Sequence, residues 1–259
     1  MPAALVRPGV AIAYERTGSG PPLVLVHGIT ESRHSWDPLV PRLAESFDVL
    51  AVDLRGHGRS AKIAPFDVGT LADDLAELLA HLDLRRPHLI GHSLGGVVVS
   101  AMAATVDPTS VINVDQPLEL SGFHDALAPA VPLIRGTPDE FDGFIASLFA
   151  SMYGPLPAAE QHRVRAHADA DQEVVNGVWS GVIDGPAAEL DAVVDAILAG
   201  ITAPYLSLHG ADPGPEYATW LTDRCPTARV EVWPDHGHYP HLVDPERFLA
   251  RAMAFTTDV

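Results

Sequence analysis

A serine lies between two glycines in a setting that suits a nucleophile. The segment Gly91-His92-Ser93-Leu94-Gly95 follows the apolar run His88–Ile90 and precedes the small, apolar stretch Val97–Ala104. A serine on a sharp turn from a strand into a helix lies at the helix N-terminus, where free N–H groups favour negative charge. We therefore predict that Ser93 is the nucleophile of an acyl transfer, and that His92 is a packing residue. The alternative is a glycine-rich turn with an incidental serine.

A second turn could stabilise the charge that develops in such a reaction. His27-Gly28-Ile29-Thr30 directly follows the apolar run Leu23–Val26. Acyl transfer needs two N–H groups directed at the oxyanion, and we predict that the backbone N–H groups of Ile29 and Leu94 supply them. An ordinary strand-end turn is the alternative reading.

A serine is a weak nucleophile until a positioned base takes its proton. Of the 13 histidines, His238 follows the last apolar run, Val230–Trp233, and precedes the helical pattern Asp244–Phe255. A loop at the end of a strand can carry its imidazole over the serine, so we predict that His238 is the base. His236 and His241 remain alternatives.

The base in turn needs a carboxylate that orients its ring and stabilises the imidazolium. Asp212 lies just past the apolar run Tyr205–Leu208, and Asp115 directly follows Val111–Val114. Either choice gives the chain order serine, aspartate, histidine. We predict Asp212, with Asp115 as the alternative.

Short apolar runs alternate with amphipathic segments along most of the chain. Leu5–Val6 and Val10–Tyr14 read as a hairpin, and six further runs read as strands. These six strands are expected at Leu23–Val26, Val49–Val52, His88–Ile90, Val111–Val114, Tyr205–Leu208 and Val230–Trp233. Between them, Thr70 to Leu82 places its leucines on one helix face, with Thr70 as the expected N-cap. This alternation predicts an α/β fold with a mostly parallel sheet covered by helices on both sides.

Residues 116–186 interrupt the alternation, because they contain helical patterns but no clear buried strand. One helix is expected to begin at Thr137-Pro138, with the proline at its first position. We predict a helical lid over 116–186 and a core made of 1–115 and 187–259. The predicted substrate contacts come from the lid and from the turn after the first parallel strand, and they are His27, Gly28, Phe123, His124, Phe144 and Trp179.

The amino-acid composition disfavours some classes of binding partner. The chain has 259 residues, 16 Lys and Arg against 34 Asp and Glu, and a formal charge of −18. Nucleic acids and anionic membranes both attract clustered basic residues, so neither is expected as a partner. The single cysteine, Cys225, cannot form an intrachain disulfide or a thiolate zinc cluster, and a structural role is expected for it. No run of 18 apolar residues and no signal-peptide pattern is seen, so a cytoplasmic location is expected.

Together these segments resemble the α/β-hydrolase fold superfamily. The resemblance rests on His27-Gly28, the segment from Asp53 to Ser60, Gly91 to Gly96, His209-Gly210-x-Asp212 and Gly237-His238, which occur in the family's order. It implies an eight-stranded, mostly parallel sheet with an inserted helical lid. It also implies Ser93, Asp212 and His238 as a triad, oxyanion donors at Ile29 and Leu94, and no cofactor or metal.

The resemblance favours a serine hydrolase that cleaves a small to medium apolar ester or lactone. Epoxide hydrolases and haloalkane dehalogenases of this fold carry an aspartate in place of Ser93. Perhydrolases usually show a tryptophan and a methionine where this chain has Ile29 and Leu94. Hydrolysis of a carbon–carbon bond in a diketone remains an alternative, as does a ligand-sensing receptor with slow turnover. Amidase activity also stays open.

Overall fold

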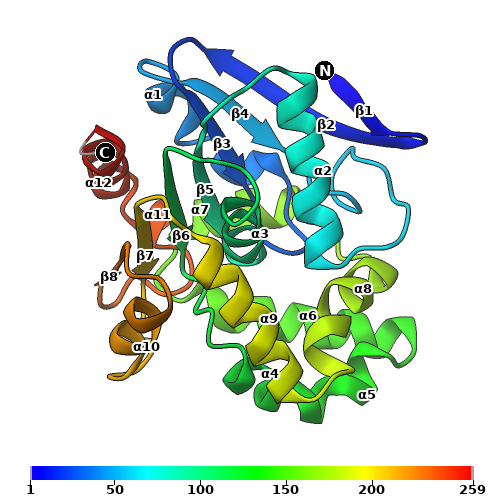
Figure 1. Ribbon diagram of the computed structural model, residues 1–259. Helices are drawn as coiled ribbons and strands as arrows, with labels where there is room; N and C mark the ends of the chain where they lie inside the picture. Colours follow the sequence, from blue (N-terminus) through cyan, green and yellow to red (C-terminus); the bar gives the residue numbers. More distant parts are fainter. Residues whose placement is uncertain (1, 258–259) are drawn as a thin grey trace.

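The chain folds around one twisted sheet. The computed structural model describes residues 2–257. Its eight strands are ordered β1-β2-β4-β3-β5-β6-β7-β8 across the sheet (Figure 1). The strands are β1 (Ala3–Arg7), β2 (Val10–Gly18), β3 (Pro22–Val26), β4 (Asp48–Val52), β5 (His88–His92), β6 (Ser110–Val114), β7 (Tyr205–His209) and β8 (Ala228–Val232). β1 pairs with β2 and β2 with β4 in antiparallel fashion, and all other neighbours are parallel. The predicted α/β architecture is confirmed, with its opening hairpin.

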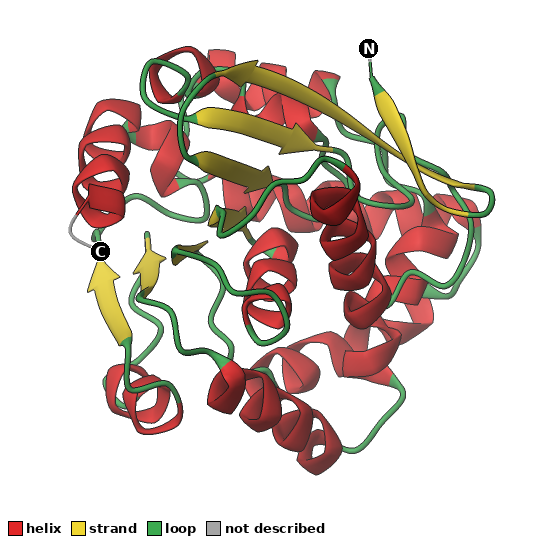
Figure 2. Ribbon diagram, turned by 45° about the horizontal axis from the view of Figure 1, so that its top comes forward, coloured by secondary structure: helices red, strands yellow, loops and turns green. Residues whose placement is uncertain are grey.

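Helices cover both faces of this sheet (Figure 2). They are η1 (Arg33–Trp36), α1 (Val40–Leu43), α2 (Val68–His81), α3 (Leu94–Ala103), α4 (Ser121–Leu127), η2 (Ala128–Ala130), α5 (Val131–Ile134), α6 (Pro138–Tyr153), α7 (Ala158–Ala166), α8 (Gln172–Ile183), α9 (Ala187–Gly200), α10 (Tyr217–Arg224), α11 (Pro240–Val243) and α12 (Pro245–Thr257).

Alternate residues of the central strands face two separate cores. In β3, Val24 and Val26 join the core formed with α2 and α3. Leu23 and Leu25 join the other, which contains residues of η1, α1 and α12. Successive side chains of a strand point to opposite faces, so a strand covered on both sides is apolar throughout. This explains the continuous apolar runs in the sequence.

Two helix starts test the capping predictions. Helix α2 begins at Val68 and not after Thr70, because the Asp67 carboxylate accepts the Thr70 N–H at 2.9 Å and forms the N-cap. The predicted cap was therefore wrong by one turn, since the leucine pattern begins only at Leu71. Helix α6 starts as predicted. Thr137 caps it, Pro138 is its first residue, and the Glu140 carboxylate accepts the Thr137 N–H at 2.8 Å.

The segment between β6 and β7 contains helices α4–α9 and, within the described part of the chain, no strand. Figure 1 shows most of these helices gathered on one side of the sheet, beyond the ends of its central strands. Helix α9 packs on α3 as well as on α4 and α8, so it touches both the sheet layer and the helical segment. The division of the chain at residues 116 and 186 stays a prediction.

The strand order places the functional loops at one edge. From β3 the chain moves to β4 on one side and then to β5 on the other, so the order reverses beside β3. Ligands of open α/β sheets bind at the carboxyl ends of the strands at such a point. Ser93 follows β5 and the Gly28–Ile29 turn follows β3, so both lie at this edge.

Candidate active site

Ser93 occupies a strained turn between β5 and α3. Its φ of 52° and ψ of −121° are unusual for a residue with a side chain. Two close approaches hold the turn. A Cβ on Gly91 would lie 2.1 Å from the Gly95 carbonyl oxygen, and a Cβ on Gly95 would lie 2.2 Å from that of Val26. Only glycine fits at either position, and the predicted strand–turn–helix around Ser93 is confirmed.

The base candidate is held by a carboxylate. His238 Nδ1 lies 2.7 Å from Asp115 Oδ2, and the Gly210 N–H donates to Asp115 Oδ1 at 2.7 Å. Burial opposes ionisation of Asp115, but the hydrogen bond from His238 holds the pKa of its carboxyl below the usual value. A carboxylate at Nδ1 leaves the other ring nitrogen, Nε2, as the proton acceptor.

The prediction of Asp212 as this partner is wrong. Asp212 is exposed, and its carboxylate accepts the Gly214 N–H at 2.8 Å within its own loop. β6 lies directly beside β5, whereas β7 lies one strand further away, so the residue after β6 is the nearer one. The alternative, Asp115, is the residue that the structure brings to His238.

The rival histidines lie elsewhere. The His236 ring lies 2.8 Å from the Pro234 carbonyl oxygen and packs against Trp233. His241 is fully buried against Trp36, and burial lowers the pKa of its imidazole well below the usual value. Of the three candidates, only His238 borders the cavity that contains Ser93.

Two backbone N–H groups are available beside the serine. Leu94 is the first residue of α3, and Ile29 lies in the turn after β3. Within residues 2–257, neither N–H donates a hydrogen bond to a protein acceptor. Both residues border the same cavity as Ser93. They stay the predicted oxyanion donors.

This cavity has a volume of about 410 Å³ and is mostly apolar. Its polar side chains are Ser93, Asp115, Gln116, Glu119 and His238. Its apolar wall is formed by Ile29, Val68, Leu94, Val97, Pro117, Leu120, Phe123, Leu148, Phe149, Met152, Val178, Trp179, Val182 and Pro213. Most of this wall comes from the segment between β6 and β7, so that segment shapes the space above the serine.

Of the residues predicted to contact substrate, Phe123 and Trp179 border the cavity. Phe144 does not border the cavity, but it packs edge-on against Trp179 with 6.4 Å between the ring centroids. His124 borders a separate surface hollow and pairs with Asp125, so its placement in the cavity was wrong.

The turn residues predicted to contact substrate do not border the cavity either. His27 is fully buried, and its Nε2 accepts the Leu54 N–H at 3.0 Å while Nδ1 donates to the Gly28 carbonyl. A Cβ on Gly28 would lie 3.3 Å from the Ser93 Cβ and 3.3 Å from His92 Nδ1. Both residues are buried in the turn after β3 and do not reach the cavity, so their predicted contact with substrate was wrong.

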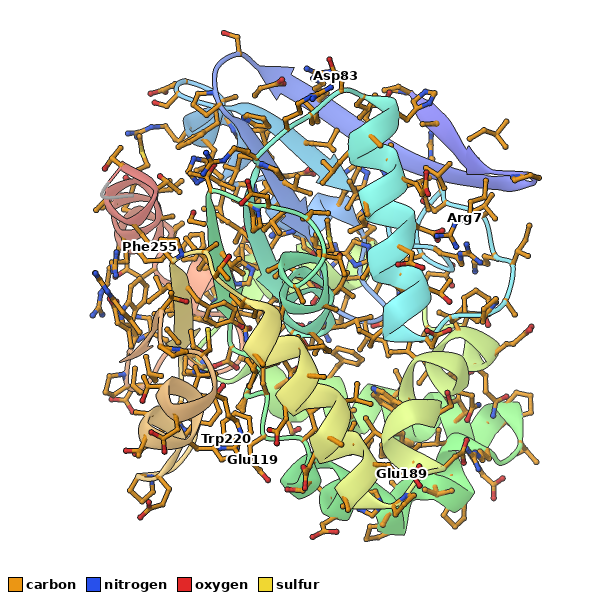
Figure 3. All side chains as sticks on the ribbon, viewed as in Figure 1. Arg7, Asp83, Glu119, Glu189, Trp220 and Phe255 are labelled. Atoms are coloured by element: carbon orange, nitrogen blue, oxygen red, sulfur yellow. The ribbon has the colours of Figure 1, made fainter. Side chains whose placement is uncertain are left out.

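Glu119 and Asp115 are the two acidic side chains among the described residues that border the cavity. Of these two, Glu119 has no partner role in the proposed contact between Asp115 and His238. Glu119 belongs to the segment that leads from β6 into α4 and is labelled in Figure 3. The described residues that border the cavity include no lysine or arginine. The described lining residues therefore form an apolar wall that carries carboxylates but no lysine or arginine.

Two polar residues beneath His238 were not found from the sequence. Glu31 and Tyr239 are buried, and the Tyr239 hydroxyl donates to Glu31 Oε1 at 2.9 Å. His92, expected to be a packing residue, is buried beside them and donates from Nε2 to the His238 carbonyl oxygen at 2.8 Å. The sequence does not mark Glu31, because two of the residues that it contacts, His92 and Tyr239, lie far from it along the chain.

Neither a metal site nor a membrane span is found in the described part of the chain. Between residues 2 and 257, no group of three or more histidines, cysteines or acidic residues is arranged to hold a metal ion. No helix in this range is both long and apolar enough to cross a membrane.

Comparison with known proteins places the chain in a family. The sequence profile of the α/β hydrolase fold matches residues 21–215, about three quarters of the chain. The chain belongs to this family, and it is a hydrolase of the α/β-hydrolase fold.

Its relatives carry several activities. A soluble epoxide hydrolase from Corynebacterium sp. is 46% identical over 35% of this chain and 32% of the relative, so the match spans about a third of that protein. A non-heme haloperoxidase from Rhodococcus erythropolis is 29% identical over 98% of this chain and 99% of the relative. A 2-(acetamidomethylene)succinate hydrolase from Mesorhizobium japonicum is 30% identical over 95% and 91%. Among solved structures, a thermophilic esterase from Thermogutta terrifontis has a TM-score of 0.74 and 28% identity over 96% of this chain and 94% of its own.

Proposed function

We propose that this protein is a serine hydrolase that cleaves a carboxylic ester or lactone through an acyl-enzyme. The observation that carries the proposal is the contact between His238 and Asp115 at 2.7 Å, at a cavity that also contains Ser93 on its strained turn. A nucleophile, a base and a carboxylate in this order are the parts that acyl transfer requires.

The proposed reaction has two halves. In the first, Ser93 Oγ attacks the carbonyl carbon while His238 Nε2 takes the hydroxyl proton, and the oxyanion is bound by the N–H groups of Ile29 and Leu94. The imidazolium then protonates the leaving alkoxide, so that an alcohol departs and the acyl group stays on Ser93. In the second half, His238 takes a proton from water, the resulting hydroxide attacks the acyl carbon, and the acid leaves as Ser93 regains its proton.

The cavity supports an uncharged, apolar acyl group as substrate. Phe123, Trp179 and the surrounding aliphatic side chains would bury it, and burial of apolar surface contributes roughly 25 cal/mol per Å². A carboxylate on the substrate would meet Glu119 without a lysine or arginine among the described lining residues. The name of the 2-(acetamidomethylene)succinate hydrolase relative therefore supports hydrolysis as the reaction of this protein, but a substrate with carboxylates does not suit this cavity.

The core and the helical segment have different roles in the proposed reaction. The core, residues 1–115 and 187–259, supplies Ser93, Asp115 and His238. The helical segment 116–186 acts as a cap that selects the acyl group. No nucleic acid, membrane or cofactor takes part in the proposed reaction.

A fluorophosphonate probe tests the nucleophile directly. It should label the wild type and not Ser93→Ala, because the probe phosphonylates an activated serine. Failure to label the wild type would contradict every version of the proposal that uses Ser93.

Substrate panels then separate the reaction classes. We expect turnover of p-nitrophenyl butyrate and of an aliphatic lactone, both abolished in Ser93→Ala. Turnover of a vinylogous diketone without turnover of any ester would show instead that the triad cleaves a carbon–carbon bond. Peroxyacid formation from acetate and peroxide, without ester turnover, would assign the chain to the perhydrolases instead.

A further inference from the structure

A buried carboxylate that the proposed reaction does not use lies beneath the His238 loop. Glu31 is 3% exposed, and its Oε2 accepts the Ser35 hydroxyl at 2.6 Å. Its Oε1 accepts the Tyr239 hydroxyl at 2.9 Å. Because a buried carboxylate is costly unless it is paired, these two donors and a third neighbour must compensate its charge.

That third neighbour is His92. Its Nδ1 lies 3.7 Å from Glu31 Oε2, an ion-pair separation longer than a hydrogen bond. Its Nε2 carries a proton, since the His238 carbonyl oxygen, 2.8 Å away, can only accept. Burial disfavours the charged form of both groups. Nevertheless, Glu31 raises the pKa of His92, and the contact with His92 lowers the pKa of Glu31.

The contacts of Glu31 lead to two consecutive residues, His238 and Tyr239. One route runs through the Tyr239 hydroxyl, and the other runs through His92 to the His238 carbonyl oxygen. Glu31 itself lies two residues after Ile29, and its N–H donates to the Gly28 carbonyl at 3.2 Å. One carboxylate therefore connects the turn with the predicted oxyanion donor to the loop with the base.

We propose that Glu31 is a positioning residue, which fixes the His238 loop relative to the Ile29 turn through the Tyr239 hydroxyl and through His92. The inference rests on the proposed function, in which His238 moves a proton in both halves of the reaction. Asp115 holds only the ring of His238, and a ring held at one nitrogen still moves with its backbone. The second anchor matters because a misplacement of 1 Å can slow an enzyme by about 100-fold.

The helical segment shields this network from solvent. Tyr153, the last residue of α6, stacks on Tyr239 at 5.9 Å between ring centroids. Both tyrosines belong to one buried apolar cluster with Leu156, Val164 and Leu242. Electrostatic interactions are stronger where water is excluded, so this cover strengthens the attraction between Glu31 and His92.

The test uses Glu31→Gln and Tyr239→Phe with p-nitrophenyl butyrate. In Glu31→Gln we expect kcat to fall about 10- to 100-fold while KM stays within about twofold, because the base is misplaced and the acyl cavity is intact. In Tyr239→Phe, which removes one hydroxyl, we expect kcat to fall about 3- to 10-fold with the same KM. The double variant should match Glu31→Gln alone, because the two residues act through one contact.

A matched control comes from a buried ion pair away from the cavity. Asp74 is 1% exposed on α2 and accepts from Arg55 Nε at 2.6 Å. Asp74→Asn should lower the Tm and leave kcat within about twofold. A change of kcat without a change of KM in the Glu31 and Tyr239 variants, against unchanged kcat in the control, separates positioning from general loss of stability.

Two results would overturn the inference. If Tyr239→Phe and Glu31→Gln both keep kcat within twofold of the wild type, Glu31 does not position the base. If Glu31→Gln does not fold, Tyr239→Phe decides alone by the same limit. If wild-type turnover survives Ser93→Ala, the proposed function itself fails and this inference fails with it, which is a distinguishable outcome.

Discussion

The carboxyl edge of the sheet and the helices between β6 and β7 meet at one cavity, yet they are built differently. Every residue of β5, β6 and β7 is buried, and glycines at the edge allow backbone approaches that no side chain would permit. By contrast, α4 and α7 each bury a single residue.

This difference indicates that the edge carries out the proposed reaction and that the helices select the substrate. The edge holds Ser93, Asp115 and His238 through strained turns and hydrogen bonds as short as 2.7 Å. The helices contribute mainly apolar side chains to the cavity, and the hydrogen bonds of Asp115 to His238 and Gly210 do not involve them. Substitutions at the edge should therefore lower kcat, and substitutions in the helices should change substrate preference.

The largest effect is expected at the nucleophile. Ser93→Ala should lower kcat/KM for p-nitrophenyl butyrate by at least about 10⁴-fold, because it removes the atom that forms the acyl-enzyme. The Tm should change little, since alanine fits where serine does. Steady-state kinetics and a thermal melt measure both, and residual turnover above about 1% would contradict the assignment.

The next effect distinguishes two aspartates at the same edge. Asp115→Asn should lower kcat by about 10³- to 10⁴-fold, because it removes the charge that stabilises the His238 imidazolium. Asp212→Asn, at an exposed loop position, should stay within about twofold. The reverse pattern, measured on the same ester, would restore Asp212 as the partner of His238.

Acid should destabilise the edge through its buried histidines. Burial lowers the pKa of His209 to about 4, whereas an unburied histidine has a pKa of about 6.5. Between these values the unfolded chain binds a proton that the folded chain does not, so the stability contribution falls as pH falls. One such proton corresponds to about 1.4 kcal/mol per pH unit.

Urea unfolding between pH 6.5 and 4 measures this slope. His209→Asn should make the dependence of the unfolding free energy on pH shallower by about one proton. The matched control, His162→Asn, changes an exposed histidine on α7 and should leave the slope as it is. Identical slopes in the wild type and His209→Asn would show that His209 is protonated in the folded state.

A smaller effect is expected in the helical wall. Trp179→Ala should raise KM for p-nitrophenyl hexanoate by about 10-fold and leave kcat for the acetate ester within about twofold, because only the longer acyl chain needs the lost surface. A fall in kcat for both esters would mean that the helices also position the triad.

The smallest effect concerns charge at the cavity. The wild type should prefer p-nitrophenyl valerate over the mono-p-nitrophenyl ester of glutarate, which has the same chain length and ends in a carboxylate. Glu119→Gln should reduce this preference by about fivefold, because it removes one repulsive charge from the wall. Asp212→Asn serves as the control, and an equal preference in Glu119→Gln and the wild type would exclude Glu119 from selection.

Local signals in the sequence predicted much of the edge and the start of one helix outside it. The turn around Ser93, the cap at Thr137 and the buried strands all follow from spacing over a few residues, and the structure contains them. The start of α2 was misplaced by one turn because Asp67 caps it ahead of the leucine pattern. The cavity wall was predicted only in part. Phe123 and Trp179 reach it, but His124 faces a different hollow, since the sequence does not specify how the helices turn against each other.

By itself the sequence determined the residue types of the proposed chemistry, with a serine on a turn between a strand and a helix and a histidine after the last strand. Only the tertiary structure decided that the carboxylate is Asp115, because β6 pairs with β5 and β7 does not. It also decided that Glu31 lies beneath His238, since 207 residues separate the two in the chain and only the folded sheet brings their loops together. Strand order and long-range contacts have no local signature, whereas turns and caps do.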